Sequence, residues 1–493
     1  MNPRLQAQPN ENFAERVHAN QRKLRSNLRT QCDFVLTLTN LVGREDSMVA
    51  STGQIGLIRG FLVASLIVSL GTSGRAQGTE AFRRRIDEVL RKPAEEQRLP
   101  GVVAMVAQGD AVVYQGAFGK QYAAKSVPMA TDSIFRIASM TKAVTSVAVM
   151  QLVERGRVKL DEPAGTYLPY LARVDVLEDF DANGAAKLRP PKTPVTVWQL
   201  LTHTSGFGYE FFDEKLSRYV AAGGVTSIRT GDDGFLKAPL LFDPGTKWEY
   251  GISIDWLGRL VEKVSGQSLE EYFRQNIFAP LGMEDSFFNV PADKQARVVT
   301  VHQRKDDGTL AENPPQVFKP AQFLRGGGGL YSTAPDYLRF TRMLLGGGKL
   351  GNTRVLQAET VALMGRNQIG DLTLTAIKSL VPQLARNVPI PGSLDKFGFG
   401  FAINTQPVEG GRASGSMAWA GVYNTFFWID PTGKTAAVLM MQLLPFMDDA
   451  AKALLEEFEL AVYGSTAQKN RSRSAVPVRN VGTKPVFDRE ARP

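Results

Sequence analysis

Ser139 and Lys142 stand three residues apart in the run Ser139-Met140-Thr141-Lys142, and such a pair can carry out nucleophilic acyl transfer. Residues i and i+3 of a helix share one face, so the lysine amine can reach the serine hydroxyl. A serine becomes an effective nucleophile when a base stands beside it. Lysine has an ordinary pKa of about 10.4, so it serves as that base at neutral pH only where burial or a nearby cation lowers the value. Taken alone, the spacing also fits a helix-capping serine and a solvated lysine.

The pair is predicted to open a long apolar-rich helix over residues 139–154, followed by Gly156. Backbone N–H groups at a helix N-terminus, together with the helix dipole, favour negative charge. A serine at this position would therefore lie where the oxyanion of an acyl-transfer reaction can be stabilised.

Strand patterns lie towards both ends of the chain, and helical patterns lie between them. Residues 101–119 indicate two strands joined at the tight turn Gly109-Asp110. The other expected elements are strands over 397–404, 422–430 and 434–443, helices over 79–97, 196–202, 255–264, 335–345 and 446–462, and loops over 181–195 and 326–329, the last a flexible glycine run. This order predicts an α+β fold with one antiparallel sheet built from both ends of the chain, flanked by helices, and an inserted helical lobe. An active site between the sheet and that lobe is expected.

Composition and charge exclude several classes of function. The 493 residues are 43% hydrophobic and carry a net charge of +9, but most of the basic excess lies in residues 1–77 and 464–493. Because nucleic-acid binding needs a basic face on the folded body, no nucleic-acid partner is expected. Cys32 is the single cysteine, which excludes an internal disulfide, and His18, His203 and His302 lack metal-ligand spacing. Neither a metal nor a cofactor is predicted.

The N-terminal region divides into two segments of different character. Residues 1–47 are polar and aperiodic, and they are expected to be a disordered or non-native extension. Residues 48–77 combine Arg59, an apolar run of about ten residues and small residues at Gly74 and Ala76, which is typical of a secretory signal cut after Ala76. The apolar run is too short for a confident membrane span, so stable membrane insertion is not expected. A buried N-terminal helix is the alternative.

These boundaries leave residues 78–463 as one folded domain, expected to carry the Ser139 chemistry, and residues 464–493 as a disordered basic tail. The expected location is the periplasm or the extracellular medium. Because the signal starts at residue 48, Met48 is a candidate for the true start of the protein.

Further motifs follow the Ser-x-x-Lys run in a fixed order. They are SIFRIASMTKAV within 133–169, VTVWQLLTHTSG (195–206), FDPGTKWEYG (242–251), PLGMEDSFF (280–288), GGGGLYSTAPDYLRF (326–340) and WAGVYNTFFWIDP (419–431). Over about 100–460 the chain resembles the penicillin-binding and class C β-lactamase-like superfamily of serine hydrolases. The resemblance implies a β-lactamase/transpeptidase-like fold.

The resemblance also implies a role for each matching residue. Ser139 would be the acylated nucleophile, Lys142 its general-base partner, and Tyr250 the proton shuttle that completes the triad. The backbone N–H groups of Ser139 and Val422 would form the oxyanion hole. His203 would belong to a structural turn rather than to a Ser-His-Asp triad, and no G-x-S-x-G nucleophile elbow occurs in the chain.

Two departures from the β-lactamase pattern indicate the substrate. Tyr250-Gly251-Ile252 stands where those enzymes usually carry Tyr-x-Asn, and Trp419-Ala420-Gly421 stands where they usually carry Lys-Thr-Gly. An amide and a cation are thus replaced by apolar groups, with Ile252, Trp419 and Gly421 as substrate-binding residues. The Trp-x-Gly form is similar to family VIII carboxylesterases. The expected activity is hydrolysis of small, short-chain carboxylic esters, compatible with weak β-lactam hydrolysis.

Other functions stay open on the same residues. A β-lactamase or D,D-peptidase, an acyltransferase or amide hydrolase, and a non-catalytic acyl-binding sensor would each keep the Ser139 motif. The Pro- and Leu-containing loop over 364–396 is predicted to shape the pocket entrance.

N-terminal sequencing of the exported protein tests the signal prediction. The mature chain should begin at Gln77, since cleavage after Ala76 satisfies the small-residue rule. Replacing that residue in an Ala76→Trp variant should slow processing, because a bulky side chain does not satisfy the rule. Exported protein that retains residues before Gln77 would contradict the assignment.

Overall fold

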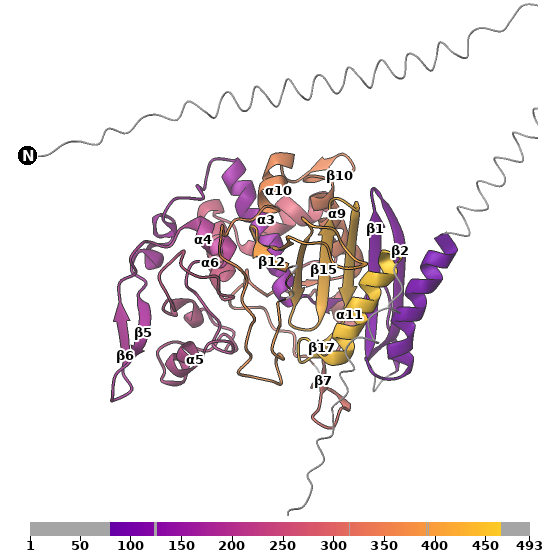
Figure 1. Ribbon diagram of the computed structural model, residues 1–493, viewed down its shortest axis with the longest axis horizontal. Coiled ribbons are helices and arrows are strands. Elements are labelled where there is room, and N and C mark those ends of the chain that lie inside the picture. Colours follow the sequence, from indigo (N-terminus) through magenta and orange to yellow (C-terminus); the bar gives the residue numbers. More distant parts are fainter. Residues whose placement is uncertain (1–78, 123–125, 315, 391, 393, 465–493) are drawn as a thin grey trace, which may run out of the picture. The chain divides into compact units, whose positions relative to one another are not determined.

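An eight-stranded antiparallel sheet joins the two ends of the folded body in the computed structural model, which describes residues 79–122, 126–314, 316–390, 392 and 394–464 (Figure 1). The join is the pairing of Val103 with Met440, two residues far apart in the chain. In order across the sheet the strands are β12 (Leu394–Phe397), β13 (Ala402–Asn404), β14 (Met417–Gly421), β15 (Thr425–Asp430), β16 (Thr435–Met440), β1 (Gly101–Gln108), β2 (Ala111–Tyr122) and β3 (Val127–Pro128).

The sheet buries both of its faces, as the alternation of side chains along β15 illustrates. Phe426 and Trp428 belong to one apolar cluster, which includes residues of the helix over 79–95 and of the C-terminal helix α11. Phe427 and Ile429 belong to the other and larger cluster, which includes the helices on the opposite face. Figure 1 shows α11 and the N-terminal helix together on one side of the sheet.

The helices of the body are α3 (Thr141–Glu154), α4 (Val197–Thr202), α5 (Glu214–Ala221), α6 (Ser253–Ser265), α7 (Leu269–Phe273), α8 (Ala279–Leu281), α9 (Ala334–Leu345), α10 (Ala358–Met364) and α11 (Asp449–Val462). Smaller pairings are β4 (Phe135–Arg136) with β9 (Tyr331–Ser332), β5 (Val176–Phe180) with β6 (Ala186–Arg189), β10 (Lys349–Leu350) with β11 (Thr353–Arg354), and β7 (His302–Arg304) between β8 (Leu310–Glu312) and β17 (Leu443–Leu444).

Helix α3 runs through the middle of the molecule. Every residue from Thr141 to Leu152 is buried, so no side of this helix faces water along that length. A helix that is apolar all round is a core helix, and its position is fixed by packing on several sides. The first turn of α3 is therefore held firmly relative to both the sheet and the helical lobe.

The predicted α+β architecture is confirmed, with strands from both ends in one sheet and a helical lobe formed by the chain between them. Several boundaries differ. The strand expected over 397–404 is a tight hairpin of β12 and β13, and the loop expected over 181–195 contains β6. The strand expected to begin at Val422 begins at Thr425, because residues 422–424 form a turn with Asn424 at a positive φ of 60°.

Residues 1–47, the predicted signal at 48–77 and the tail from 465 lie outside the described residues. Among the residues described, no helix combines the length and the apolar character needed to cross a membrane.

Candidate active site

Ser139 lies in a short turn directly before α3, not in the helix itself. The turn is the 3₁₀ segment Ala138–Met140, closed by a hydrogen bond from Met140 N to Ile137 O of 3.1 Å. Ala138 has a φ of +43°, a strained value for a residue with a side chain. Strain of this kind persists where the surrounding structure enforces it, often at functional sites. It leaves Ser139 partly exposed between the buried residues Ala138 and Met140.

Lys142 is buried beside this serine, with only 1% of its surface exposed. Its ammonium group donates to Ser139 Oγ over 3.2 Å, to Tyr209 Oη over 3.0 Å and to Gly327 O over 2.6 Å. A lysine ammonium has three protons to donate, so each has a partner. The amine is thus held in one position, within reach of the serine hydroxyl.

Tyr250 lies on another side of the same amine. Its ring centre is 4.8 Å from Lys142 Nζ, within the range of a cation–π contact. Its ring also contacts that of Trp419 on β14, at 5.1 Å between centroids. Tyr250 therefore lies between the lysine and the strand that carries Trp419-Ala420-Gly421.

Tyr209 was missed by sequence reasoning, although its hydroxyl is the phenol that hydrogen-bonds Lys142. It follows closely on the HTSG run at 203–206, and this spacing was the available signal. Burial raises the pKa of Tyr209 above its ordinary value and outweighs the opposing effect of Lys142, while Asp255 and Tyr250 raise it further. Tyr209 is therefore a neutral phenol at neutral pH, suited to hold the lysine rather than to take a proton.

The surroundings of Lys142 bear on the condition that its pKa must be lowered for it to act as a base. Burial does lower its pKa, as expected, but the neighbouring groups Tyr209, Tyr250 and Asp255 outweigh burial and raise the pKa above its ordinary value. The condition for a neutral base is therefore not met at rest, because the neighbours are phenols and a carboxylate, with no second cation among them. The resting amine is consequently an ammonium group at neutral pH.

The backbone of Val422 lies close to the turn that carries Ser139. A Cβ on the preceding Gly421 would be 2.3 Å from Ile137 O, so the two main chains touch here and only glycine fits. Thr425 Oγ1 also donates to Ile137 O, at 3.4 Å. The end of β14 and the serine turn therefore pack directly against each other. The predicted oxyanion hole requires this proximity, because its two backbone amides must reach the same oxygen atom.

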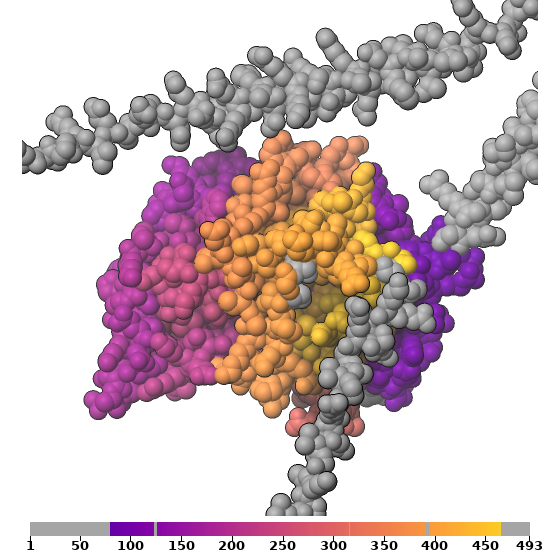
Figure 2. Space-filling model, viewed as in Figure 1, coloured from indigo at the N-terminus to yellow at the C-terminus, as the bar shows by residue number. Residues whose placement is uncertain are grey.

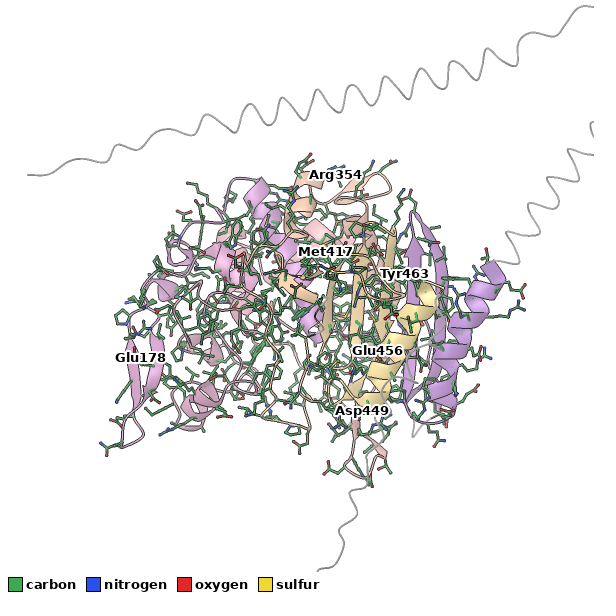
Figure 3. All side chains as sticks on the ribbon, viewed as in Figure 1. Glu178, Arg354, Met417, Asp449, Glu456 and Tyr463 are labelled. Carbon is green, nitrogen blue, oxygen red and sulfur yellow. The ribbon has the colours of Figure 1, made fainter. Side chains whose placement is uncertain are left out.

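The predicted substrate-binding residues fall into two groups. Trp419 and Gly421 lie on β14, and the partly exposed Trp419 ring stands between Tyr250 and Phe397. Met417, labelled in Figure 3, begins this strand near the centre of the molecule. Ile252 is buried just before α6 and lines, with Tyr209, a mainly apolar hollow on the side of α5.

His203 ends α4 in a left-handed conformation and is completely buried. Its ring lies 5.1 Å from that of Tyr250, and neither ring nitrogen has a hydrogen-bond partner among the described residues. Burial, with Lys142 nearby, lowers its pKa well below the ordinary value, so the ring is neutral. Without a carboxylate partner this histidine does not form a Ser-His-Asp triad.

Within the part of the chain that the structure describes, no three His, Cys, Asp or Glu side chains are grouped as a metal ion would require.

The loop between α10 and β12 crosses from one lobe to the other. Leu380 N donates to Phe211 O at 2.9 Å on the helical side, and Phe446 N donates to Leu384 O at 2.9 Å on the sheet side. Figure 2 shows this orange part of the chain down the middle of the face between the magenta lobe and the yellow strands. The ring of Phe211 stacks on that of Tyr209, with 4.8 Å between the ring centroids. Since Tyr209 hydrogen-bonds Lys142, the loop is connected to Lys142 through these two residues.

Comparisons with known proteins agree with this geometry. The family described as Beta-lactamase matches residues 86–461. The chain is 32% identical to monacolin J acid methylbutanoyltransferase of Aspergillus terreus over 400 residues, covering 78% of this chain and 96% of the relative. It is 32% identical to esterase EstB of Burkholderia gladioli over 391 residues, covering 73% and 91%. A solved mutant of simvastatin synthase (LovD) from Aspergillus terreus matches with a TM-score of 0.67 at 32% identity, covering 77% of this chain and 94% of that one.

Removing each phenol hydroxyl in turn tests which tyrosine moves protons. Tyr250→Phe keeps the ring beside Lys142 but removes the hydroxyl, and it should lower the acylation rate of Ser139 by about 10²- to 10⁴-fold, as loss of a general acid–base group does. Tyr209→Phe should lower it by roughly ten-fold, since it removes a support of the lysine. The measurement is burst kinetics with a p-nitrophenyl ester. A larger loss in Tyr209→Phe than in Tyr250→Phe would reverse the assignment.

Proposed function

This chain belongs to the Beta-lactamase family of serine hydrolases and acyltransferases, and we propose that it acts there as a carboxylesterase on small, short-chain esters, through an acyl–Ser139 intermediate. The observation that carries the proposal is the placement of Ser139, Lys142 and Tyr250 against an aromatic wall at Trp419. The 32% identity to an esterase supports it.

The first half of the proposed reaction acylates the serine. A neutral Lys142, formed when the ammonium loses a proton, accepts the Ser139 Oγ proton at 3.2 Å as the oxygen attacks the ester carbonyl carbon. The carbonyl oxygen becomes an oxyanion and rests on the backbone N–H groups of Ser139 and Val422. The C–O bond to the alcohol then breaks, and the alcohol oxygen receives, through Tyr250, the proton that Lys142 took from Ser139, which leaves Lys142 neutral again.

The second half frees the enzyme. A water molecule gives a proton back through Tyr250 and attacks the acyl carbon, and the same two amides hold the second oxyanion. The bond to Ser139 Oγ breaks, this oxygen recovers a proton from Lys142, and the carboxylic acid departs. The steps balance without an oxidant or a cofactor.

The apolar wall is the reason for preferring esters over β-lactams. An anionic substrate gains most from a cation at the position where this chain has Trp419, and an amide side chain gains from an Asn where this chain has Ile252. Trp419 stands between two aromatic rings and offers no positive charge. A neutral ester loses nothing in this environment, whereas a carboxylate would be desolvated without a partner.

Acyl transfer to an alcohol is a second candidate, favoured by the similarity to a methylbutanoyltransferase over 78% of the chain. Transfer and hydrolysis share the acyl–Ser139 intermediate and differ only in whether an alcohol or water attacks it. The loop across the face between the two lobes lies where it could influence that choice, because it contacts Phe211 beside Tyr209.

We also propose that the protein acts after export to the periplasm or the medium, on the strength of the signal-like residues 48–77. Small esters reach such a location without a transporter.

Direct comparison of substrates tests the proposed function. Wild-type protein should hydrolyse p-nitrophenyl acetate or butyrate with a kcat/KM about 10- to 100-fold above that for a chromogenic cephalosporin, because a missing hydrogen bond to a charged group costs about 1.5–3 kcal/mol. Ser139→Ala should abolish turnover, and intact-mass measurement on wild type should show one added acetyl or butyryl group. A faster cephalosporin reaction, or unchanged activity in Ser139→Ala, would overturn the proposal.

Product analysis separates hydrolysis from transfer. With p-nitrophenyl butyrate and increasing concentrations of a small alcohol, a hydrolase should release mainly butyric acid, whereas a transferase should form mainly the new ester and show a higher rate of nitrophenol release when deacylation limits turnover. The reaction without alcohol is the control. Dominant ester formation at millimolar alcohol would favour the second candidate.

A further inference from the structure

Asp255 is a buried carboxylate to which the proposed reaction assigns no part. It lies in the first turn of α6, five residues after Tyr250, and only 1% of its surface is exposed. Its Oδ1 accepts a hydrogen bond from Gly327 N at 2.9 Å, while its Oδ2 has no hydrogen-bond partner among the described residues. A buried and incompletely satisfied carboxylate is costly to maintain, so its presence calls for a physical reason.

The peptide groups of Gly327 connect this carboxylate to the catalytic lysine. Its N–H donates to Asp255, and its carbonyl oxygen accepts from Lys142 Nζ at 2.6 Å. One residue therefore contacts the acid through its amide and the base through its carbonyl. Thr145 on α3 fixes the neighbouring peptide by donating to Gly326 O at 2.6 Å.

The glycine run at 326–329 is shaped for this contact. A Cβ on Gly326 would be 2.9 Å from Gly258 Cα on α6, and a Cβ on Gly327 would be 2.3 Å from Asp255 Oδ2. Glycine is thus required for the main chain to pass this close to α6. The expectation of a flexible loop was wrong, because Gly326 and Gly327 are buried and hydrogen-bonded on both sides.

The charged and titratable groups around Lys142 come from four segments. Tyr209 and Tyr250 lie before α5 and α6, Asp255 lies on α6, and the neutral His203 ends α4. Of these four residues, only Asp255 has a carboxyl group. It is therefore the natural counter-charge for an ammonium group in this cluster.

We propose that Asp255 is a positioning residue for acyl transfer, which orients Lys142 through the Gly327 peptide and stabilises the proton that Lys142 takes from Ser139. When the serine oxygen attacks, one proton moves from Oγ to Nζ and a positive charge develops on the amine. Once the ammonium has lost its proton to solvent, a fixed negative charge close to that point stabilises the transition state more than the state with a neutral amine. The inference rests on the proposed role of Lys142 as the base.

The test is the pH dependence of Ser139 acylation in an Asp255→Asn variant, in which the amide oxygen can still accept from Gly327 N. Without the negative charge, the pKa of Lys142 should fall. The acid limb of the pH–rate profile, where the rate rises as Lys142 loses its proton, should therefore shift to lower pH by about one unit or more. The plateau rate should fall by roughly 10- to 100-fold, because a weaker base takes the proton less readily. A lower plateau with an unmoved limb would mean a structural role only and would refute the proposal.

Two variants serve as controls. Thr145→Val loosens the Gly326 peptide without changing any charge, so it should lower the plateau and leave the limb in place. Asp336→Asn alters another buried carboxylate that accepts a backbone N–H bond, from Asp285 at 2.7 Å, and should leave the limb unmoved. If Asp255→Asn does not fold, Asp255→Ser keeps an oxygen acceptor for Gly327 and takes its place.

Labelling by a fluorophosphonate probe separates this inference from the proposed function. The probe reports serine activation whatever the natural substrate is. Wild type that is labelled with a clear acid limb but does not hydrolyse esters would reject the esterase proposal and still allow the Asp255 test. An unmoved labelling limb in Asp255→Asn, with ester hydrolysis intact in wild type, would reject the Asp255 proposal alone.

Discussion

The three hydrogen bonds of the buried Lys142 ammonium are the constraint on which the site depends. A lone ammonium in the interior is very unfavourable, and it is tolerated here because each proton has an acceptor and a carboxylate stands nearby. The acceptors come from the serine turn, from the segment before α5 and from the glycine run. One side chain therefore fixes three parts of the chain that are distant in sequence.

The sheet provides the other half of the arrangement. Gly421 at the end of β14 packs on Ile137, so the position of the serine turn follows the position of this strand. The strand is held in turn by β15 and β16, and β16 pairs with β1 from the other end of the chain. The amides predicted to hold the oxyanion are thus anchored to the core, while the lysine is fixed by the helical lobe. An active site between these parts requires both to be folded.

The order of the motifs made the fold and the main site predictable. Each motif is a short run of adjacent residues, so it can be recognised in the sequence without knowledge of tertiary contacts. Ser139 and Lys142 lie within 3.2 Å as their spacing implied, although their roles in catalysis stay a prediction. Asp255 and the contacts of Gly327 were not found, because their importance comes from tertiary contacts, and Tyr209 was missed although it lies close after the HTSG run. The same limit applies to the pKa of Lys142, because the sequence does not reveal which charges surround a buried amine. Glycine runs are ambiguous in the same way, since they permit both flexibility and close packing.

The charge state of Lys142 depends both on the polar groups around it and on the absence of a cation at the position of Trp419. At rest Asp255 is the one carboxylate among the neighbours that raise the pKa of Lys142, the other two being phenols. In an enzyme with a cation at the position of Trp419, a second positive charge would stand near this lysine, would favour its neutral form and would attract anionic substrates. Replacement of that cation by an aromatic ring changes both properties at once. Under the proposed function the substrate is then neutral, and Lys142 as the proposed base is freed from its proton by pH or by substrate binding rather than by a neighbouring charge. A pocket of this kind suits an uncharged ester, whose arrival excludes water and brings no charge that would hold the proton on the lysine.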